Sequence, residues 1–89
     1  MPTISMFYGI LVSLYYKDSQ RHNLPHIHVR YQNAKASISI ESGELLDGAF
    51  PPKQLRLVQA WVEIHQDDLM ADWQLALNGE VPFKIAPLV

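Results

Sequence analysis

The stretch "HIHVRYQNAKASISIESGELLDG", residues 26–48, carries the pattern that decides the fold. Residues 26–31 alternate strictly between the two sides of a predicted strand. The apolar side consists of Ile27, Val29 and Tyr31, and the polar side consists of His26, His28 and Arg30. Alternation resumes at residues 35–41 after the turn "QNAK". The turn "ESGE" then leads into a short strand at residues 44–48, because glycine supplies the positive φ that hairpin turns need. The stretch therefore predicts antiparallel strands joined by tight turns.

The segment "FYGILVSLYY", residues 7–16, is rich in β-branched and aromatic side chains and has the length of a long strand. Both of its sides are largely apolar, which predicts a central position in the sheet. Gly9 indicates a bulge or a close approach of another backbone. The polar segment "KDSQRHNLP", residues 17–25, ends in proline and is typical of a loop. Together with residues 26–48, these segments predict a four-stranded antiparallel meander.

Two helices are predicted after the sheet, at residues 51–66 and 67–79. Two prolines open the first helix, where a missing amide is tolerated. The second has an acidic start that suits the helix dipole and an Asn-Gly stop. The apolar stripes of the two segments are rotated relative to each other, which predicts a bend or short break near residues 66–68, with one unbroken helix as the alternative. The tail "VPFKIAPLV" alternates Val81, Phe83 and Ile85 and is expected to dock as an extended segment or an edge strand.

These elements predict a single α+β domain over residues 1–89, in which two C-terminal helices cover one face of the meander and the tail is extended. Hydrophobic residues make up 48% of the chain and charged residues 18%, which is typical of a globular domain. The absence of cysteine excludes disulfides and thiolate metal sites and fits a reducing cytoplasm. No signal peptide is visible, and no apolar run approaches the roughly 20 residues that span a bilayer. We therefore expect a cytoplasmic protein without a membrane partner.

The charges of the chain are unevenly distributed. Residues 1–40 carry four basic residues and one acidic residue, a net charge of +3, whereas residues 41–89 carry three basic and eight acidic residues, a net charge of −5. One interpretation is internal complementarity between a basic sheet region and acidic helices. The other is a basic patch for RNA or for an acidic partner. Four basic residues are few for nucleic-acid binding, so nucleic acid is not an expected partner.

Two histidines of the polar side, His26 and His28, project from one strand face roughly 7 Å apart. Two imidazoles at this spacing can hold two positions around zinc or another divalent metal, given one or two further ligands. Candidates for those ligands are Asp18, His22, Glu41 and His65. Three interpretations stay open: the histidines face solvent, they face another chain or ligand, or they bind a metal.

The fourth histidine, His65, lies on the apolar stripe of the first predicted helix. A lone histidine in such a place is typically a core residue with one ring nitrogen satisfied by hydrogen bonding. His65 joins His26 and His28 only if the helix crosses the histidine side of the strand. If the helix lies on the side of Ile27 and Val29, the three histidines do not cluster.

Several stretches of the chain match one family at once, namely "MPTIS-FYGI", "LYYKD", "PHIHVRY", "IESGELLDG", "LRLVQAWVEIHQDDL--DWQLA" and "KIAPL". Over Met1–Leu88 the chain resembles the domain-of-unknown-function family 4160 of small bacterial proteins. Trp61 and His65 match the family's helical Trp-x-x-x-His pattern. Met6 stands where members often have arginine, and the loop before Pro25 is longer than is usual. The resemblance implies no established activity. It implies that the chain is encoded by a small gene next to a gene for another short domain of unknown function, an arrangement typical of toxin–antitoxin-like pairs.

Two functional hypotheses follow from the sequence. The first is a protein-interaction module without a cofactor, either a homodimer or one half of such a two-gene pair, since no catalytic motif is present and a meander edge can pair with another strand. The second is a hydrolase or ribonuclease built on His26 and His28, with His65 or Asp18 as a further member. In that case a bound metal activates water, or the imidazoles act as acid and base.

Overall fold

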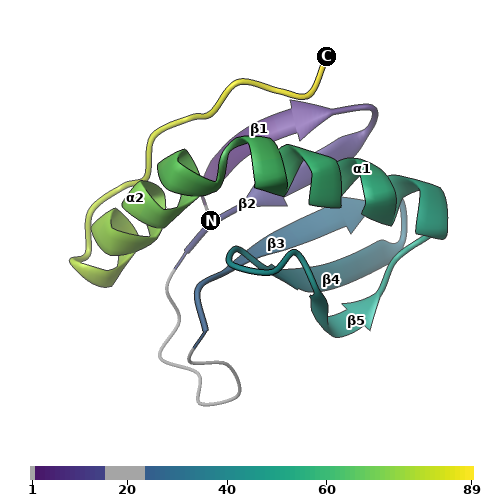
Figure 1. Cartoon of the computed structure of the whole chain (residues 1–89), viewed down its shortest axis with the longest axis horizontal. Coiled ribbons are helices and arrows are strands. Elements are labelled where there is room, and N and C mark those ends of the chain that lie inside the picture. The colour runs from purple at the N-terminus through teal and green to yellow at the C-terminus, as the bar shows by residue number, and fades with distance from the viewer. Residues whose placement is uncertain (1, 16–23) are drawn as a thin grey trace.

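The computed structural model describes residues 2–15 and 24–89, and these residues form five β-strands followed by two α-helices (Figure 1). The strands are β1 (Thr3–Phe7), β2 (Ile10–Ser13), β3 (His26–Tyr31), β4 (Ala34–Ser39) and β5 (Leu45–Ala49). The helices are α1 (Pro52–Ile64) and α2 (Gln66–Leu77). Each strand pairs antiparallel with the next one in the chain, so the sheet is a meander in the order β1-β2-β3-β4-β5.

The predicted α+β class is confirmed, but the prediction of four strands is wrong. Residues 7–16 do not form one long strand, because Tyr8 and Gly9 turn the chain between Phe7 and Ile10, which pair with each other. Both turn residues have positive φ, 50° at Tyr8 and 78° at Gly9. Two positive φ values are the signature of a type I′ hairpin turn. Gly9 is therefore a turn residue rather than a bulge, and residues 3–7 supply the fifth strand.

The predicted strand at residues 26–31 is confirmed as β3. A two-residue turn joins it to β4, so Tyr31 pairs with Ala34 and every later pair follows from that register. The pairing of β4 with β5 is less regular, with a shift between Ser37 and Ile38. Gly48 in β5 has a φ of 84°, and a Cβ at this position would collide with the carbonyl oxygen of Lys35. The close approach of the two strands here therefore requires glycine.

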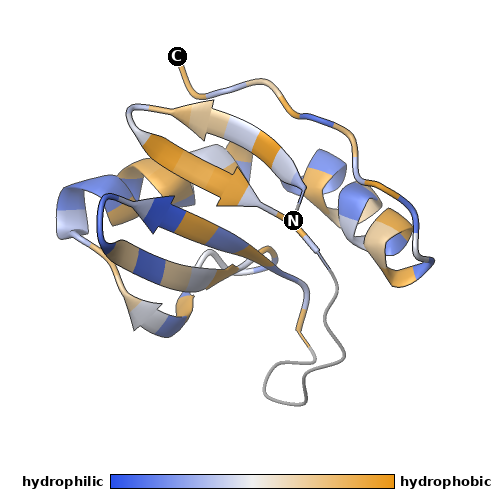
Figure 2. Ribbon diagram, turned by 180° about the vertical axis from the view of Figure 1, so that it is seen from behind, coloured by the Kyte–Doolittle hydropathy of each residue, from blue (hydrophilic) through white to orange (hydrophobic). Residues whose placement is uncertain are grey.

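One face of the sheet forms the hydrophobic core together with α1 and α2, which lie across it in Figure 1. The fully buried residues of the strands are Ile4, Ile10, Val12, Ile27 and Ile38, and Leu14 and Ile40 directly after β2 and β4 join them. Helix α1 adds Val58, Trp61 and Val62. Seen from behind, in Figure 2, the opposite face carries no helix. We call this opposite face the open face; its strand residues include Leu11, Ser13, His28, Arg30, Lys35 and Ser37.

The helical region is interrupted at His65, one residue before the predicted break, where φ is −109° and ψ is 26°. The break separates α1 from α2, so the alternative of one unbroken helix is wrong. Trp73 of α2 packs against the ring of His26 at the start of β3, with centroids 5.1 Å apart. Within the described ranges, no helix combines the length and the apolar character needed to cross a membrane.

The tail after α2 runs back across the molecule beside β1 (Figure 1). Three hydrogen bonds hold it: Phe83 donates its backbone N–H to the Asp72 carboxylate, Ile85 donates to the Ile4 carbonyl, and the Trp61 indole donates to the Ala86 carbonyl. The tail is therefore an extended docked segment. Two apolar side chains of the tail are not buried by this docking, since Val81 is 75% exposed and Phe83 73% exposed.

Candidate functional site

His28 lies at the centre of the open face. Its neighbours on β3, Ile27 and Val29, are 0% and 3% exposed beneath the helices, and period-two alternation therefore directs His28 to the opposite face. Its cross-strand partners are Ser13 on β2 and Ser37 on β4. The Ser37 hydroxyl oxygen lies 3.5 Å from the His28 Nδ1, a long contact for a hydrogen bond. The imidazole is thus flanked by two hydroxyl groups.

A hollow of about 410 Å³ surrounds His28 on the open face. Its lining comes from β1 to β5 and from Tyr15, which follows β2. The strand residues that line it include Thr3, Leu11, Ser13, Arg30, Lys35, Ser37 and Asp47. One polar row crosses the sheet through the successive pairs Ser13–His28, His28–Ser37 and Ser37–Asp47. In the next row Arg30 pairs with Lys35, so two cationic side chains stand beside each other in the hollow. This arrangement can bind an anion and can offer an imidazole for proton transfer.

A second hollow, of about 480 Å³, lies between β1 and the C-terminal tail. It shares Thr3 and Leu11 with the first hollow, so the two adjoin on the sheet. Its remaining lining is mostly apolar and consists of Ile4, Ser5, Met6, Lys84, Ile85, Ala86 and Pro87. The Ser5 hydroxyl is buried and has no hydrogen-bond partner among the described residues. We call the two adjoining hollows the cross-sheet groove.

His26 lies at the start of β3 and is buried, with 7% of its surface exposed. Its Nδ1 donates a hydrogen bond to the Leu24 carbonyl oxygen at 2.8 Å, which fixes the ring orientation. The ring lies between two others, with centroids 5.1 Å from Trp73 and 5.0 Å from His28. The interpretation of a solvent-facing histidine is therefore wrong for His26, which connects the open face to α2.

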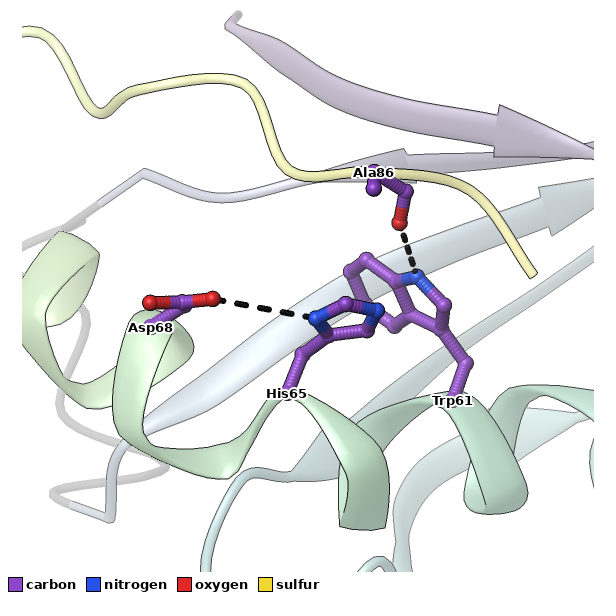
Figure 3. A network of polar contacts seen from close by, with 4 residues as sticks. All are labelled: Trp61, His65, Asp68 and Ala86. Carbon is purple, nitrogen blue, oxygen red and sulfur yellow. Dashed lines mark hydrogen bonds and ion pairs between the residues drawn. The ribbon is translucent and has the colours of Figure 1, made fainter.

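His65 lies in the helical layer, between Trp61 and Asp68 (Figure 3). Its Nδ1 is 3.7 Å from an Asp68 carboxylate oxygen, and its ring centroid is 5.4 Å from that of Trp61. Because α1 covers the Ile27–Val29 side of β3, the condition for a three-histidine cluster with His26 and His28 is not met.

His26 and His28 are brought together, as their ring contact shows, and they supply two imidazoles for the metal site predicted from the sequence. In residues 2–15 and 24–89, no group of three or more histidine, aspartate or glutamate side chains is arranged to hold a metal ion. Asp18 and His22, two of the candidate ligands, lie outside the described residues. Metal binding by this pair stays the alternative to a protein without a cofactor.

Asp72 is a buried carboxylate that sequence reasoning missed. It is 2% exposed on α2, and one oxygen accepts the Phe83 backbone N–H at 2.9 Å. Its other oxygen, Oδ2, has no hydrogen-bond partner among the described residues. Burial raises the pKa of Asp72 above its ordinary value, and the nearby negative charge of Asp68 adds to the increase, whereas the Phe83 hydrogen bond opposes it. Asp72 therefore holds the tail at the cost of desolvating a charge.

Sequence reasoning also did not identify Ser13, Ser37 and Asp47 as neighbours of His28 on the sheet. Ser13 and Ser37 look unremarkable in the sequence, and Asp47 lies 19 positions away from His28 in the chain. The register of the β3–β4 hairpin was the available signal, since a two-residue turn at residues 32–33 places Ser37 opposite His28 and Lys35 opposite Arg30. The bulge between β4 and β5 gave no such signal for Asp47.

Comparison with known proteins identifies one family. Searches of curated proteins and of solved structures gave no significant match. The model of the family described as "Domain of unknown function (DUF4160)" matches residues 9–74, which include β2 to β5, α1 and most of α2. The match therefore contains His26, His28 and His65 together with most of the first hollow. Because it covers more than half of the chain, the protein belongs to this DUF4160 family.

Proposed function

We propose that this chain is a small protein-interaction module that binds an acidic partner on the open face of its sheet. The observation that carries the proposal is the pairing of Arg30 with Lys35 beside His28 in a hollow of about 410 Å³. A hollow of this size is within the usual range of binding sites, which is roughly 300–1,000 Å³. Asp47 is the one carboxylate among the described residues that line it, so cationic groups predominate.

The charge distribution of the whole chain supports the same direction of binding. The helical half carries the acidic excess, and α2 begins with Asp67 and Asp68 in its first turn. An acidic partner approaching the molecule is therefore attracted to the open face and repelled from the helices. Such charge complementarity sets the orientation and the rate of association more than it sets the affinity.

The partner class that we favour is a second small cytoplasmic protein, of the kind encoded beside the genes of this family in toxin–antitoxin-like pairs. A homodimer is the alternative occupant. The open face suits either occupant, because an antiparallel sheet can leave one face without a covering layer and so accessible to a partner. Neither toxin nor antitoxin activity is assigned to this chain by the proposal.

The test is co-purification of the untagged chain with the tagged product of the adjacent gene. Arg30→Glu combined with Lys35→Glu reverses the charge of the hollow, and Lys53→Glu combined with Arg56→Glu makes the same change on the exposed side of α1. Loss of capture in the first pair alone supports the proposal. Equal capture by both pairs contradicts it. Sedimentation velocity of the chain alone separates the homodimer from the two-protein complex.

A second candidate function is histidine-based cleavage of RNA. It is favoured by one observation, the His28 imidazole standing beside the Ser37 hydroxyl in the same hollow as Arg30 and Lys35. An imidazole can move protons while two cations stabilise the charge that develops on a phosphoryl group. In the metal-dependent version, His26 and His28 hold a divalent ion. Labelled RNA is incubated with tag-free protein, with and without zinc, and His28→Gln is the control. Cleavage that is lost in His28→Gln favours this second function over the interaction module.

A further inference from the structure

We infer that the partner segment bound by the open face is an extended peptide of about six residues, with acidic side chains about two residues from one end and an apolar side chain about four residues further along. This inference rests on the proposed function, and it assigns the two halves of the cross-sheet groove to two kinds of side chain. The first half is the hollow around Arg30 and Lys35, and the second half is the hollow between β1 and the tail.

The length follows from the geometry of the sheet. Four inter-strand steps separate β5 from β1, and at about 4.8 Å per step the path measures about 19 Å. An extended chain advances about 3.3 Å per residue, so about six residues cover the path. From the midpoint between β3 and β4 to β1 the distance is about 12 Å, which corresponds to about four residues.

The acidic side chains of the peptide belong over Arg30 and Lys35. These two residues face each other across β3 and β4, so a carboxylate placed between them contacts both cations. Asp47 lies on the next strand, β5, and its carboxylate disfavours an acidic side chain of the peptide over β5. The position of the acidic side chains is thereby limited to the middle of the sheet.

The apolar end belongs in the second hollow. Its lining is dominated by apolar groups, and Met6, which is 64% exposed, stands at its rim with a flexible side chain that can cover a ligand. The buried Ser5 hydroxyl lines the same hollow without a hydrogen-bond partner among the described residues. A peptide backbone group supplies the partner that a buried hydroxyl requires.

A peptide fits this groove better than single-stranded RNA does. Proteins that bind single strands without sequence preference rely on aromatic rings on which bases stack. In the first hollow the ring of Tyr15 is stacked on His28. None of the described residues that line the second hollow is aromatic. The net charge of −2 also disfavours a polyphosphate over a peptide with few charges.

The test uses fluorescein-labelled octapeptides and the full chain, with binding measured by anisotropy. The parent peptide carries two glutamates and, four positions later, a leucine, with glycine and serine elsewhere. Three matched peptides replace the glutamates by glutamine, replace the leucine by serine, or move the leucine directly beside the glutamates. The protein variants are Lys35→Glu and Met6→Ser, with Lys53→Glu as the control on α1. An octauridylate tests the nucleic-acid alternative.

We expect the parent peptide to bind at least about fivefold more tightly than each matched peptide, which corresponds to about 1 kcal/mol. Met6→Ser is expected to weaken binding of the parent peptide and to leave unchanged the binding of the peptide in which serine replaces the leucine. The inference is overturned if leucine spacing has no effect, if octauridylate binds more tightly than the parent, or if a second copy of the chain occupies the groove. If charge reversal at Arg30 and Lys35 abolishes partner capture while Met6→Ser and leucine spacing have no effect, only this inference fails. If charge reversal leaves capture intact, the proposed function fails with it.

Discussion

The imidazole of His28 lies flat on the phenol ring of Tyr15, with ring centroids 4.3 Å apart and planes inclined by 10°. This stack forms one wall of the first hollow and sets the direction in which the imidazole points. A second contact continues the series, since the edge of His26 meets His28 at a centroid distance of 5.0 Å and His26 in turn meets Trp73. The binding face is therefore connected to α2 through packed rings.

Replacing Tyr15 by leucine tests the stack. The variant keeps apolar volume but removes the aromatic partner of His28, so we expect a loss of about 1 kcal/mol in the free energy of unfolding. Partner binding should weaken severalfold, because the imidazole loses its fixed orientation. Urea titration and partner affinity measure the two effects. Tyr15→Phe retains the ring and should behave as the wild type in both; a Phe variant as weak as the Leu variant would show that the hydroxyl matters instead.

Gly48→Ala should destabilise the sheet more than Gly79→Ala. Both glycines have positive φ, 84° and 78°, so both substitutions carry a backbone penalty of about 1 kcal/mol. At Gly48 the new methyl group also meets the backbone of Lys35 and Ala36, whereas at Gly79 it meets open space. The expected difference between the two variants is a further 1–3 kcal/mol or so. Thermal unfolding of the pair checks it, and equal midpoints would contradict the close β4–β5 approach.

Asp72 should make stability fall as the pH rises. Because burial raises its pKa in the folded state, the native protein retains a proton that the unfolded chain has lost, so the folded state binds more protons in that interval. The contribution of Asp72 is complete below the unfolded pKa of about 3.9 and is lost as the pH rises through the folded value. Urea titrations at a series of pH values measure how the free energy of unfolding changes with pH. Asp72→Asn should remove the part of this pH dependence that comes from Asp72, while Asp68→Asn at the exposed neighbour should reduce it only slightly. An unchanged profile in Asp72→Asn would refute the assignment.

Trp61→Phe should loosen the C-terminal tail. The indole N–H donates to the Ala86 carbonyl at 2.8 Å, and phenylalanine cannot replace this hydrogen bond (Figure 3). A net loss of about 1 kcal/mol is expected from the bond itself, with faster hydrogen exchange at residues 83–88. Phe83→Ser is the control, because its exposed side chain is not needed for the backbone hydrogen bond to Asp72. Unchanged exchange in Trp61→Phe would mean that the tail is held by other contacts.

Protein purified without a histidine tag should contain no stoichiometric metal. His26 and His28 offer two imidazoles, and a site would need Asp18 or His22 to complete it. Elemental analysis measures the metal content directly. Stoichiometric zinc that disappears in His28→Gln would favour the metal-dependent hydrolase over the interaction module.

The sequence predicted the strand at residues 26–31 and the break between the helices because each rests on a local periodicity. In the strand, His28 alternates with buried Ile27 and Val29. In the helices, the shift of the apolar stripe forces an interruption, and His65 occupies it. Both features are fixed by neighbouring residues and need no knowledge of distant contacts.

The hairpin at Tyr8–Gly9 was not predicted because the flanking apolar residues run through it without a polar interval. Type I′ turns usually carry asparagine or aspartate before glycine, whereas here a tyrosine takes the positive φ of 50°. The residues that other strands add to the site were missed for a different reason. Lys35 and Asp47 join His28 and Arg30 through cross-strand register, and the position of Asp47 depends on a bulge that local pattern does not reveal.

Chemical-shift mapping tests most directly whether an acidic partner binds the open face. The chain is small enough for a complete ¹⁵N–¹H spectrum, which is titrated with the co-purified partner. We predict that the largest shifts occur at Leu11, Ser13, His28, Arg30, Lys35 and Ser37, with little change along α1. Largest shifts on α1 and α2, with the backbone amides of these strand residues unmoved, would contradict the account.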